Sequence, residues 1–107
     1  GDLIAFASSD ETLKENLVAI PNALTKVGLM TGYTYDWKAA KYNDTDHLTV
    51  VGESDTGVIA QQVAALGLPG ITTTREDGTM AVRYERIVPI LIEAIKELEA
   101  RVKTLEG

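Results

Sequence analysis

The residues with the most reactive chemistry gather near the start of this chain of 107 residues. The sequence has no cysteine and one histidine, His47, so thiolate chemistry and histidine-pair metal sites are excluded. A serine hydroxyl is a poor nucleophile until a base takes its proton, and with His47 remote the base would have to be a lysine. Ser8, Ser9 and Lys14 lie close together in the chain. Residue types alone leave two interpretations open: a serine–lysine pair, or serines that cap a helix beside a solvated lysine.

The separation of Ser9 and Lys14 limits how the two side chains can meet. Five positions along a continuous α-helix turn through roughly 500°, which places the side chains on different faces. Ser9 must therefore lie outside any helix that carries Lys14. The carboxylates near Lys14 favour its protonated form, so the isolated lysine should be inert, and burial in a subunit interface would favour the neutral base.

Periodicity and turn residues predict the elements that position this segment. Ser8 and Glu11 fit a capping box, with Ser9 and Asp10 as competing caps, so a helix is expected to start here and run as far as Val18. The further expected elements are a helix over Asn22–Leu29, a strand over Tyr33–Lys38, a loop or hairpin over Ala39–Asp55, a short strand and helix from Gly57 to Gly67, and a hairpin of Ile71–Thr74 and Met80–Tyr84 around Asp77-Gly78.

The last segment carries the most regular pattern of the chain. Its apolar residues follow the 3, 4, 3, 4, 3 spacing of a heptad stripe: Val88, Leu91, Ile95, Leu98, Val102 and Leu105. Pro89 suits the first turn of such a helix. An ordinary amphipathic helix is the alternative, but little chain remains to cover the last two turns, so we expect self-association. Arg101 and Glu106 occupy g and e positions, a pairing that favours parallel chains in register.

Composition limits the class of protein. The size allows one modest domain, and the fold class expected is α+β, a small helical domain with short β-hairpins and a C-terminal coiled-coil helix. A net charge of -6 argues against nucleic acid and acidic membrane surfaces as partners. No apolar run approaches the ~18 residues of a membrane span, and Leu3–Ala7 lacks the features of a secretory signal, so an intracellular product, or one released by lysis, is expected.

Three strings together resemble the C-terminal intramolecular chaperone domain of bacteriophage tailspikes, tail fibres and neck appendages, the endosialidase-type self-cleaving domain. They are S-D-x-x-L-K-x-N at Ser9–Asn16, G-x-I-A-Q-x-V at Gly57–Val63, and Tyr84–Leu91 running into the terminal helix. The resemblance covers Ser9–Gly107. The chain departs from the family pattern at Gln62, where Glu is more usual, and Ala39–Asp55 matches no recognised pattern.

The resemblance implies a homotrimeric domain that helps the stalk of its own parent chain to fold and then cuts itself off between Ser8 and Ser9. Ser9 would be the nucleophile and Lys14 its general base, in a serine endopeptidase that acts once, in cis. Residues 1–8 would end the stalk and residues 9–107 would form the chaperone. The heptad stripe would form the trimer interface, although β-branched residues at a with leucine at d favour two chains in simple coiled coils. The domain would act in the host cytoplasm during phage assembly and be absent from the mature fibre or only loosely retained.

Other candidate sites carry less weight. The acidic residues Asp36, Asp44, Asp46, Asp55 and Asp77 lack calcium-loop spacing, so no metal is expected. Gly67–Gly70 lacks the lysine of a phosphate loop. The aromatic residues around Trp37 are expected to pack against other residues. No cofactor is expected. The competing functions are a non-catalytic trimerisation or registration module of a fibrous protein and, more remotely, a coiled-coil adaptor, which would leave the first motif unexplained.

Overall fold

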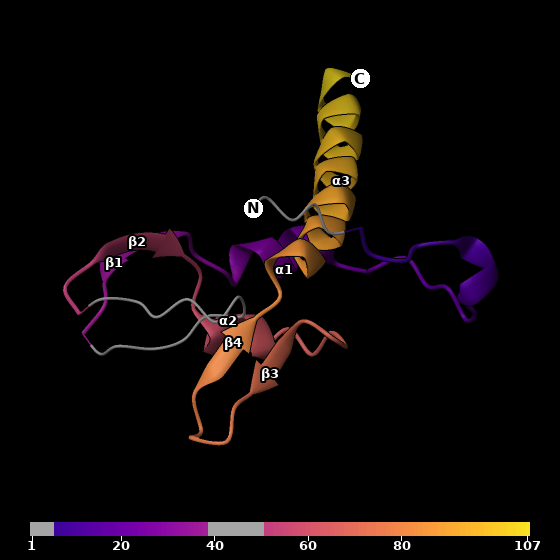
Figure 1. Cartoon of the computed structure of the whole chain (residues 1–107). Coiled ribbons are helices and arrows are strands. Elements are labelled where there is room, and N and C mark those ends of the chain that lie inside the picture. Colours follow the sequence, from indigo (N-terminus) through magenta and orange to yellow (C-terminus); the bar gives the residue numbers. More distant parts are fainter. Residues whose placement is uncertain (1–5, 39–50) are drawn as a thin grey trace.

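The computed structural model describes residues 6–38 and 51–107 and confirms the α+β class (Figure 1). Short helices and two antiparallel two-stranded sheets precede one long terminal helix. In chain order the elements are the 3-10 helix η1 (Glu11–Leu13), α1 (Ala23–Gly28), β1 (Tyr33–Asp36), β2 (Ser54–Gly57), α2 (Ala60–Ala64), β3 (Thr72–Thr74), β4 (Met80–Val82), the 3-10 helix η2 (Tyr84–Arg86) and α3 (Val88–Glu106).

The hydrophobic core is small and lies around the base of α3. Ile90 and Val63 are its largest fully buried side chains, and the described part of the chain buries seven apolar residues in all. They are Ala23, Val63, Ile71, Val82, Ile87, Ile90 and Ala94. Sixteen large apolar residues of the described part are exposed, so the chain by itself leaves more apolar side chains in solvent than it buries.

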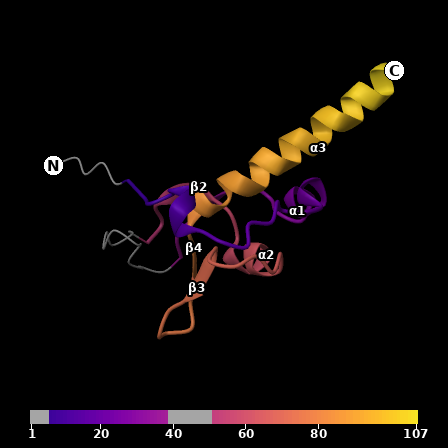
Figure 2. The same ribbon diagram turned by 90° about the vertical axis from the view of Figure 1, so that its right-hand side faces the viewer.

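The terminal helix α3 is confirmed, with Pro89 in its first turn. Ile90 and Ala94 are buried, and α1 makes the most extensive contact with this helix. The C-terminal half of α3 projects beyond the other described elements in both views (Figures 1 and 2). Only the first half of the helix is therefore held by its own domain.

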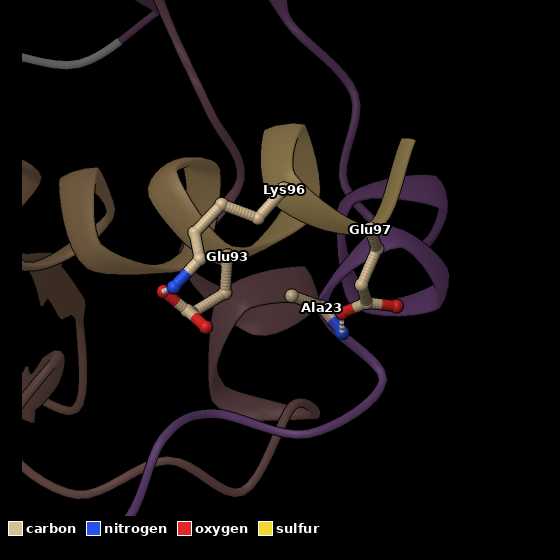
Figure 3. Close-up of polar contacts among 4 residues, drawn as sticks. All are labelled: Ala23, Glu93, Lys96 and Glu97. Atoms are coloured by element: carbon tan, nitrogen blue, oxygen red, sulfur yellow. Dashed lines mark hydrogen bonds and ion pairs between the residues drawn. The ribbon is translucent and has the colours of Figure 1, made fainter. Parts of the chain in front are cut away.

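Glu97 links α3 to the start of α1. Its Oε2 accepts a hydrogen bond of 2.6 Å from the backbone N–H of Ala23, at the N-terminus of α1, as Figure 3 shows. The residue before α1, Asn22, has a left-handed backbone and makes no side-chain cap, so a carboxylate from the distant helix satisfies a free N–H there. Lys96 and Glu93 form a separate ion pair of 3.4 Å on α3.

The predicted strand at Tyr33–Lys38 forms as β1 and pairs antiparallel with β2, from Tyr33 opposite Gly57 to Asp36 opposite Ser54. The pairing continues beyond the strands, because the N–H of Trp37 bonds to the carbonyl of Glu53 at 2.9 Å. Ser54 and Asp55, the end of the predicted loop or hairpin, thus belong to β2, and the short strand expected from Gly57 instead ends at that residue. Residues 39–50, with the turn expected at Asn43–Asp46, lie outside the described residues.

The predicted hairpin around Asp77-Gly78 is confirmed. Its strands β3 and β4 pair antiparallel, from Thr72 opposite Val82 to Thr74 opposite Met80, and within the described residues they form a sheet of their own. Gly78 has φ +88°, a conformation that side chains with a Cβ rarely adopt. The residue types of this turn were therefore a sound signal for its geometry.

The helix predicted from Ser8 to Val18 is wrong. The structure has only the one-turn η1 there, and the chain beyond Lys14 is not helical. The capping residue is Asp10, whose side chain accepts the Thr12 N–H; Ser8 does not cap the turn. Leu13, Leu17 and Val18 are exposed, so none of the described elements packs on these side chains to stabilise a helix here. Most of the apolar run Leu3–Ala7 lies outside the described residues.

Candidate functional site

The structure brings Ser9 and Lys14 into direct contact. Lys14 Nζ donates a hydrogen bond to Ser9 Oγ at 2.8 Å. This is the heavy-atom distance that proton transfer from the hydroxyl to a neutral lysine amine requires. The geometry also agrees with the expectation that Ser9 lies outside a helix carrying Lys14, although Lys14 itself follows the one turn of η1.

A tight turn between the two residues creates this contact. Asp10 Oδ1 accepts hydrogen bonds from the backbone N–H of Thr12 at 2.9 Å and from its hydroxyl at 2.7 Å. The backbone N–H of Lys14 then closes the turn on the carbonyl of Glu11 at 3.0 Å. Asp10 is thus hydrogen-bonded to Thr12, and Lys14 Nζ donates to Ser9.

The same bonds change the acidity of the capping carboxyl. The pKa of Asp10 is lowered, first by the hydrogen bond from the Thr12 backbone and then by that from its hydroxyl. Both bonds favour the charged carboxylate. The turn that positions Ser9 and Lys14 is therefore strongest when Asp10 is ionised.

The chain beyond Lys14 bends away at Asn16. Lys14 is extended, with φ -124° and ψ 147°, and Asn16 has a left-handed backbone with φ 55°. Asparagine tolerates that conformation better than most residues that have a Cβ. This gives a structural reason for the last residue of the S-D-x-x-L-K-x-N motif.

Residues 6–19 form an exposed segment, which we call the arm. Every one of its residues is exposed, including Ser9 and Lys14. In Figure 1 the arm extends away from the base of α3, on the side opposite the β1–β2 hairpin. Water therefore surrounds both candidate catalytic groups in the single chain.

The predicted interface stripe is also exposed. Val88 and Leu98 are 52% and 50% exposed, and Ile95 is 65% exposed. Leu91, Val102 and Leu105 complete the stripe, and all are exposed as well. The residues of α3 that the domain covers, Ile90 and Ala94, belong to a different face, so the whole stripe remains open to another chain.

The described aspartates that were considered as metal ligands form ordinary hydrogen bonds within the chain. Asp36 accepts a bond from Ser54, and Asp55 accepts bonds from Trp37 Nε1 and the Thr56 N–H. The described residues hold no group of three or more His, Cys, Asp or Glu that could bind a metal ion. Asp44, Asp46 and His47 lie outside the described residues. No helix within the described ranges is long and apolar enough to cross a membrane.

Gln62 has a structural role that its place in the motif did not reveal. Its Oε1 accepts a bond from the Thr31 N–H, and its Nε2 donates to the Tyr33 hydroxyl, both at 3.2 Å. The bond from Gln62 is the main cause of a lowered pKa at Tyr33. A glutamate at this position could accept the first bond but could not donate the second.

Comparison with known proteins identifies the family. The sequence profile of a peptidase family described as the chaperone of endosialidase matches residues 9–71, more than half of the chain. The chain belongs to the chaperone-of-endosialidase family. The match begins at Ser9 and includes Lys14.

Relatives of known identity are much longer than this chaperone-of-endosialidase chain. The long tail fiber protein Gp37 of Enterobacteria phage K3 and that of Enterobacteria phage T2 are each 34% identical to it over 106 residues. The alignments cover 95% of this chain but only 8% and 7% of the two relatives. The chain thus corresponds to a small part of each relative's length.

One residue of the site escaped the sequence analysis. Thr12 stabilises the turn that brings Ser9 and Lys14 together, because both its N–H and its hydroxyl donate to Asp10. The signal was present, because an aspartate followed two positions later by threonine is typical of a side-chain-capped turn. The longer helix predicted there concealed this turn.

Proposed function

We propose that this chain is the trimerising folding chaperone of a phage tail fibre or tailspike and that it releases itself by autoproteolysis at the Ser8–Ser9 bond. Membership of the chaperone-of-endosialidase family and the likeness to two long tail fibre proteins support the chaperone role. The contact of 2.8 Å between Lys14 Nζ and Ser9 Oγ is the observation that carries the proteolytic role. The domain acts in the host cytoplasm during assembly and leaves the mature fibre.

The proposed reaction starts with an acyl shift, because the nucleophile belongs to the residue after the cleaved bond. Neutral Lys14 takes the proton of the Ser9 hydroxyl, and Oγ forms a bond to the carbonyl carbon of Ser8. The bond between that carbon and the Ser9 nitrogen breaks, and the nitrogen receives the proton from Lys14. The product is an ester between the Ser8 carbonyl and Ser9 Oγ, with a free amine on Ser9.

Water completes the cleavage. Attack on the ester carbonyl transfers a hydroxyl to Ser8 and returns a proton to Ser9 Oγ, and Lys14 is again the base. The products are a chain that ends in the carboxylate of Ser8 and a chain that begins at Ser9. Neither step requires a metal or a cofactor.

In this mechanism, assembly of the chains produces the neutral form of Lys14 that acts as the base. A protonated lysine cannot act as a base, and every residue of the arm that carries Lys14 is exposed to water. Contact with other chains removes water from around Lys14 and favours its neutral form. Cleavage therefore waits until chains have associated through the open stripe of α3.

We infer three chains from the domain as a whole. Valine and isoleucine at a with leucine at d favour pairs in simple parallel coiled coils, but this stripe has fewer than three heptads and the rest of the domain must pack too. A trimer also matches what the family resemblance implies. Arg101 at g and Glu106 at e favour a parallel arrangement.

A non-catalytic registration module is the second candidate. The exposure of Ser9 and Lys14 to water favours it, because an exposed pair can be purely structural. In that case the chain would trimerise through α3 and remain whole.

The test uses the mass of the chain after expression. Wild-type protein is expected to lose residues 1–8 and to start at Ser9 on N-terminal sequencing. Ser9→Ala removes the attacking oxygen and Lys14→Ala removes the base, so both variants should stay whole. Ser8→Ala is the matched control and should cleave, because every residue offers a carbonyl. Cleavage of Ser9→Ala would disprove the assigned nucleophile, and a whole wild-type assembly would favour the registration module.

A further inference from the structure

An apolar groove lies where the arm joins α3. It has a volume of about 300 Å³ and is shallow and largely open to solvent. Its walls are the end of the arm, the adjoining Ile20 and the first turns of the helix. The lining residues are Val18, Ala19, Ile20, Pro89, Ile92 and Glu93. Val18 is 82% exposed and Ile92 is 52% exposed, so the single chain does not fill this groove.

The groove is continuous with the heptad stripe. Ile92 is four residues after Val88 and three before Ile95, so these side chains are neighbours on the helix surface. In the heptad that starts at Val88, Pro89 and Ile92 occupy positions b and e. The groove therefore lies along the e flank of the stripe.

The opposite flank of α3 carries α1. Ile87 and Ala94 occupy g positions and Ile90 a c position, and all three are buried. Glu97, at the next c position, holds the N-terminus of α1. Each α3 thus has α1 on its g flank and the groove on its e flank.

Parallel association brings these two flanks together, because the g flank of one helix faces the e flank of the next. The charges favour this orientation. Arg101 at g meets Glu106 at the following e position of a parallel neighbour in register. The groove of one chain then faces α1 of a second copy. Leu29, the C-cap residue of α1, is 59% exposed and is apolar like the groove.

We propose that the groove takes the outer side of α1, including Leu29, from a second copy of this chain. The contact holds the end of the arm against its neighbour, and Val18 is only four residues from Lys14. Docking therefore fixes the arm when chains assemble. Association through the stripe then also restricts the segment that carries the cleavage site. This inference rests on the proposed function for its consequence in cleavage, but the contact itself can be tested separately.

A disulfide test measures the contact without cleavage. The chain has no cysteine, so single introduced cysteines report one contact at a time. We would mix a chain carrying Ser9→Ala and Val18→Cys with one carrying Ser9→Ala and Leu29→Cys, then oxidise the mixture. A disulfide-linked heterodimer is expected. The matched control, Leu17→Cys, is similarly exposed but does not line the groove, and it should give much less.

Light scattering on the same samples separates the outcomes. Assembled chains without the Val18–Leu29 disulfide would overturn the proposed contact and leave the proposed function standing. Equal yields from Leu17→Cys and Val18→Cys would also overturn it, because a mobile arm would explain both. Monomeric chains would overturn it together with the trimer.

A second variant pair tests the consequence in cleavage. Val18→Asp places a charge in the apolar contact and should slow cleavage by about tenfold or more while assembly persists, since the loss of one buried aliphatic contact is sufficient for that change. Leu17→Asp introduces the same charge one residue away and should cleave near the wild-type rate. Equal cleavage in both variants would show that the groove does not control the site.

Discussion

At the scale of single residues, the arrangement of the candidate site depends on Asp10 more than on the two reactive groups. Ser9 and Lys14 touch only because the chain between them folds into one turn. Asp10 holds that turn through two bonds to Thr12. Asn16 then directs the chain away through a left-handed backbone.

A substitution pair tests the role of this cap. Asp10→Ala removes the acceptor of both Thr12 bonds and should slow self-cleavage severalfold, because the turn forms less often. Asp10→Asn keeps a side-chain oxygen that can accept the same bonds and should cleave at close to the wild-type rate. Time courses of fragment mass measure both. Equal rates in the alanine and asparagine variants would show that the cap does not position the dyad.

The capping carboxyl also predicts a dependence on pH. Its pKa lies below the ordinary value of 3.8, so the turn has its full stability above that value and loses it as the pH falls through the lower pKa of the folded chain. In the uncleaved Ser9→Ala protein, the amide proton of Thr12 should shift in NMR spectra with a midpoint below 3.8. The added Asp10→Asn substitution should abolish that shift. A midpoint above 3.8 would contradict the assigned bonds.

At the scale of elements, one contact connects the G-x-I-A-Q-x-V motif to η2, the short helix that precedes α3. The hydroxyl of Tyr84, in η2, accepts a bond of 3.2 Å from the N–H of Val58. Gly57, at the end of β2, lies directly against that hydroxyl, and a Cβ at this position would collide with it. The glycine of G-x-I-A-Q-x-V thus has a steric reason, which connects β2 to the segment that leads into α3.

A double-mutant cycle measures this contact. Gly57→Ala should displace the half-exposed Tyr84 side chain and break its bond to Val58, which should lower the free energy of unfolding by about 1 kcal/mol. Tyr84→Phe removes the bond to Val58 and should cost about 1 kcal/mol. The double variant should cost less than the sum, because the phenylalanine leaves room for the new methyl group. Urea unfolding of uncleaved protein gives the values, and strict additivity would contradict the proposed collision.

At the scale of the whole molecule, the single chain is incomplete as an apolar structure. Among the described residues, seven buried apolar side chains form the core, while the heptad stripe, Ile92 and the apolar residues of the arm face solvent. Exposed apolar surface of this extent marks a site of association. Assembly and cleavage are therefore expected to be lost together when the stripe is disrupted.

Leu98→Asp tests this coupling at a residue far from Ser9 and Lys14 in sequence. Leu98 is half exposed, so the substitution should leave the fold of the chain intact. It should prevent association, because it places a charge in the heptad stripe. Light scattering should show trimers for the wild type and monomers for the variant, and the variant should remain uncleaved. Ala100→Asp, at an f position outside the stripe, is the control and should assemble and cleave. Normal cleavage in a monomeric Leu98→Asp chain would disprove activation by assembly.

The amino-acid sequence by itself determined the features that depend on neighbouring residues. The Asp77-Gly78 turn, the α1 region and the full length of α3 follow from local turn chemistry and periodicity, and the motif that starts at Ser9 was sufficient to indicate the family. Tertiary structure decided the rest. A capping box and apolar residues predicted a helix through Val18, but a helix needs a surface to cover its apolar face, and the described part of the chain supplies none there. Packing also decided that α1 covers Ile90 and Ala94 and leaves the heptad stripe open, because which face of a helix is buried depends on residues distant in the chain.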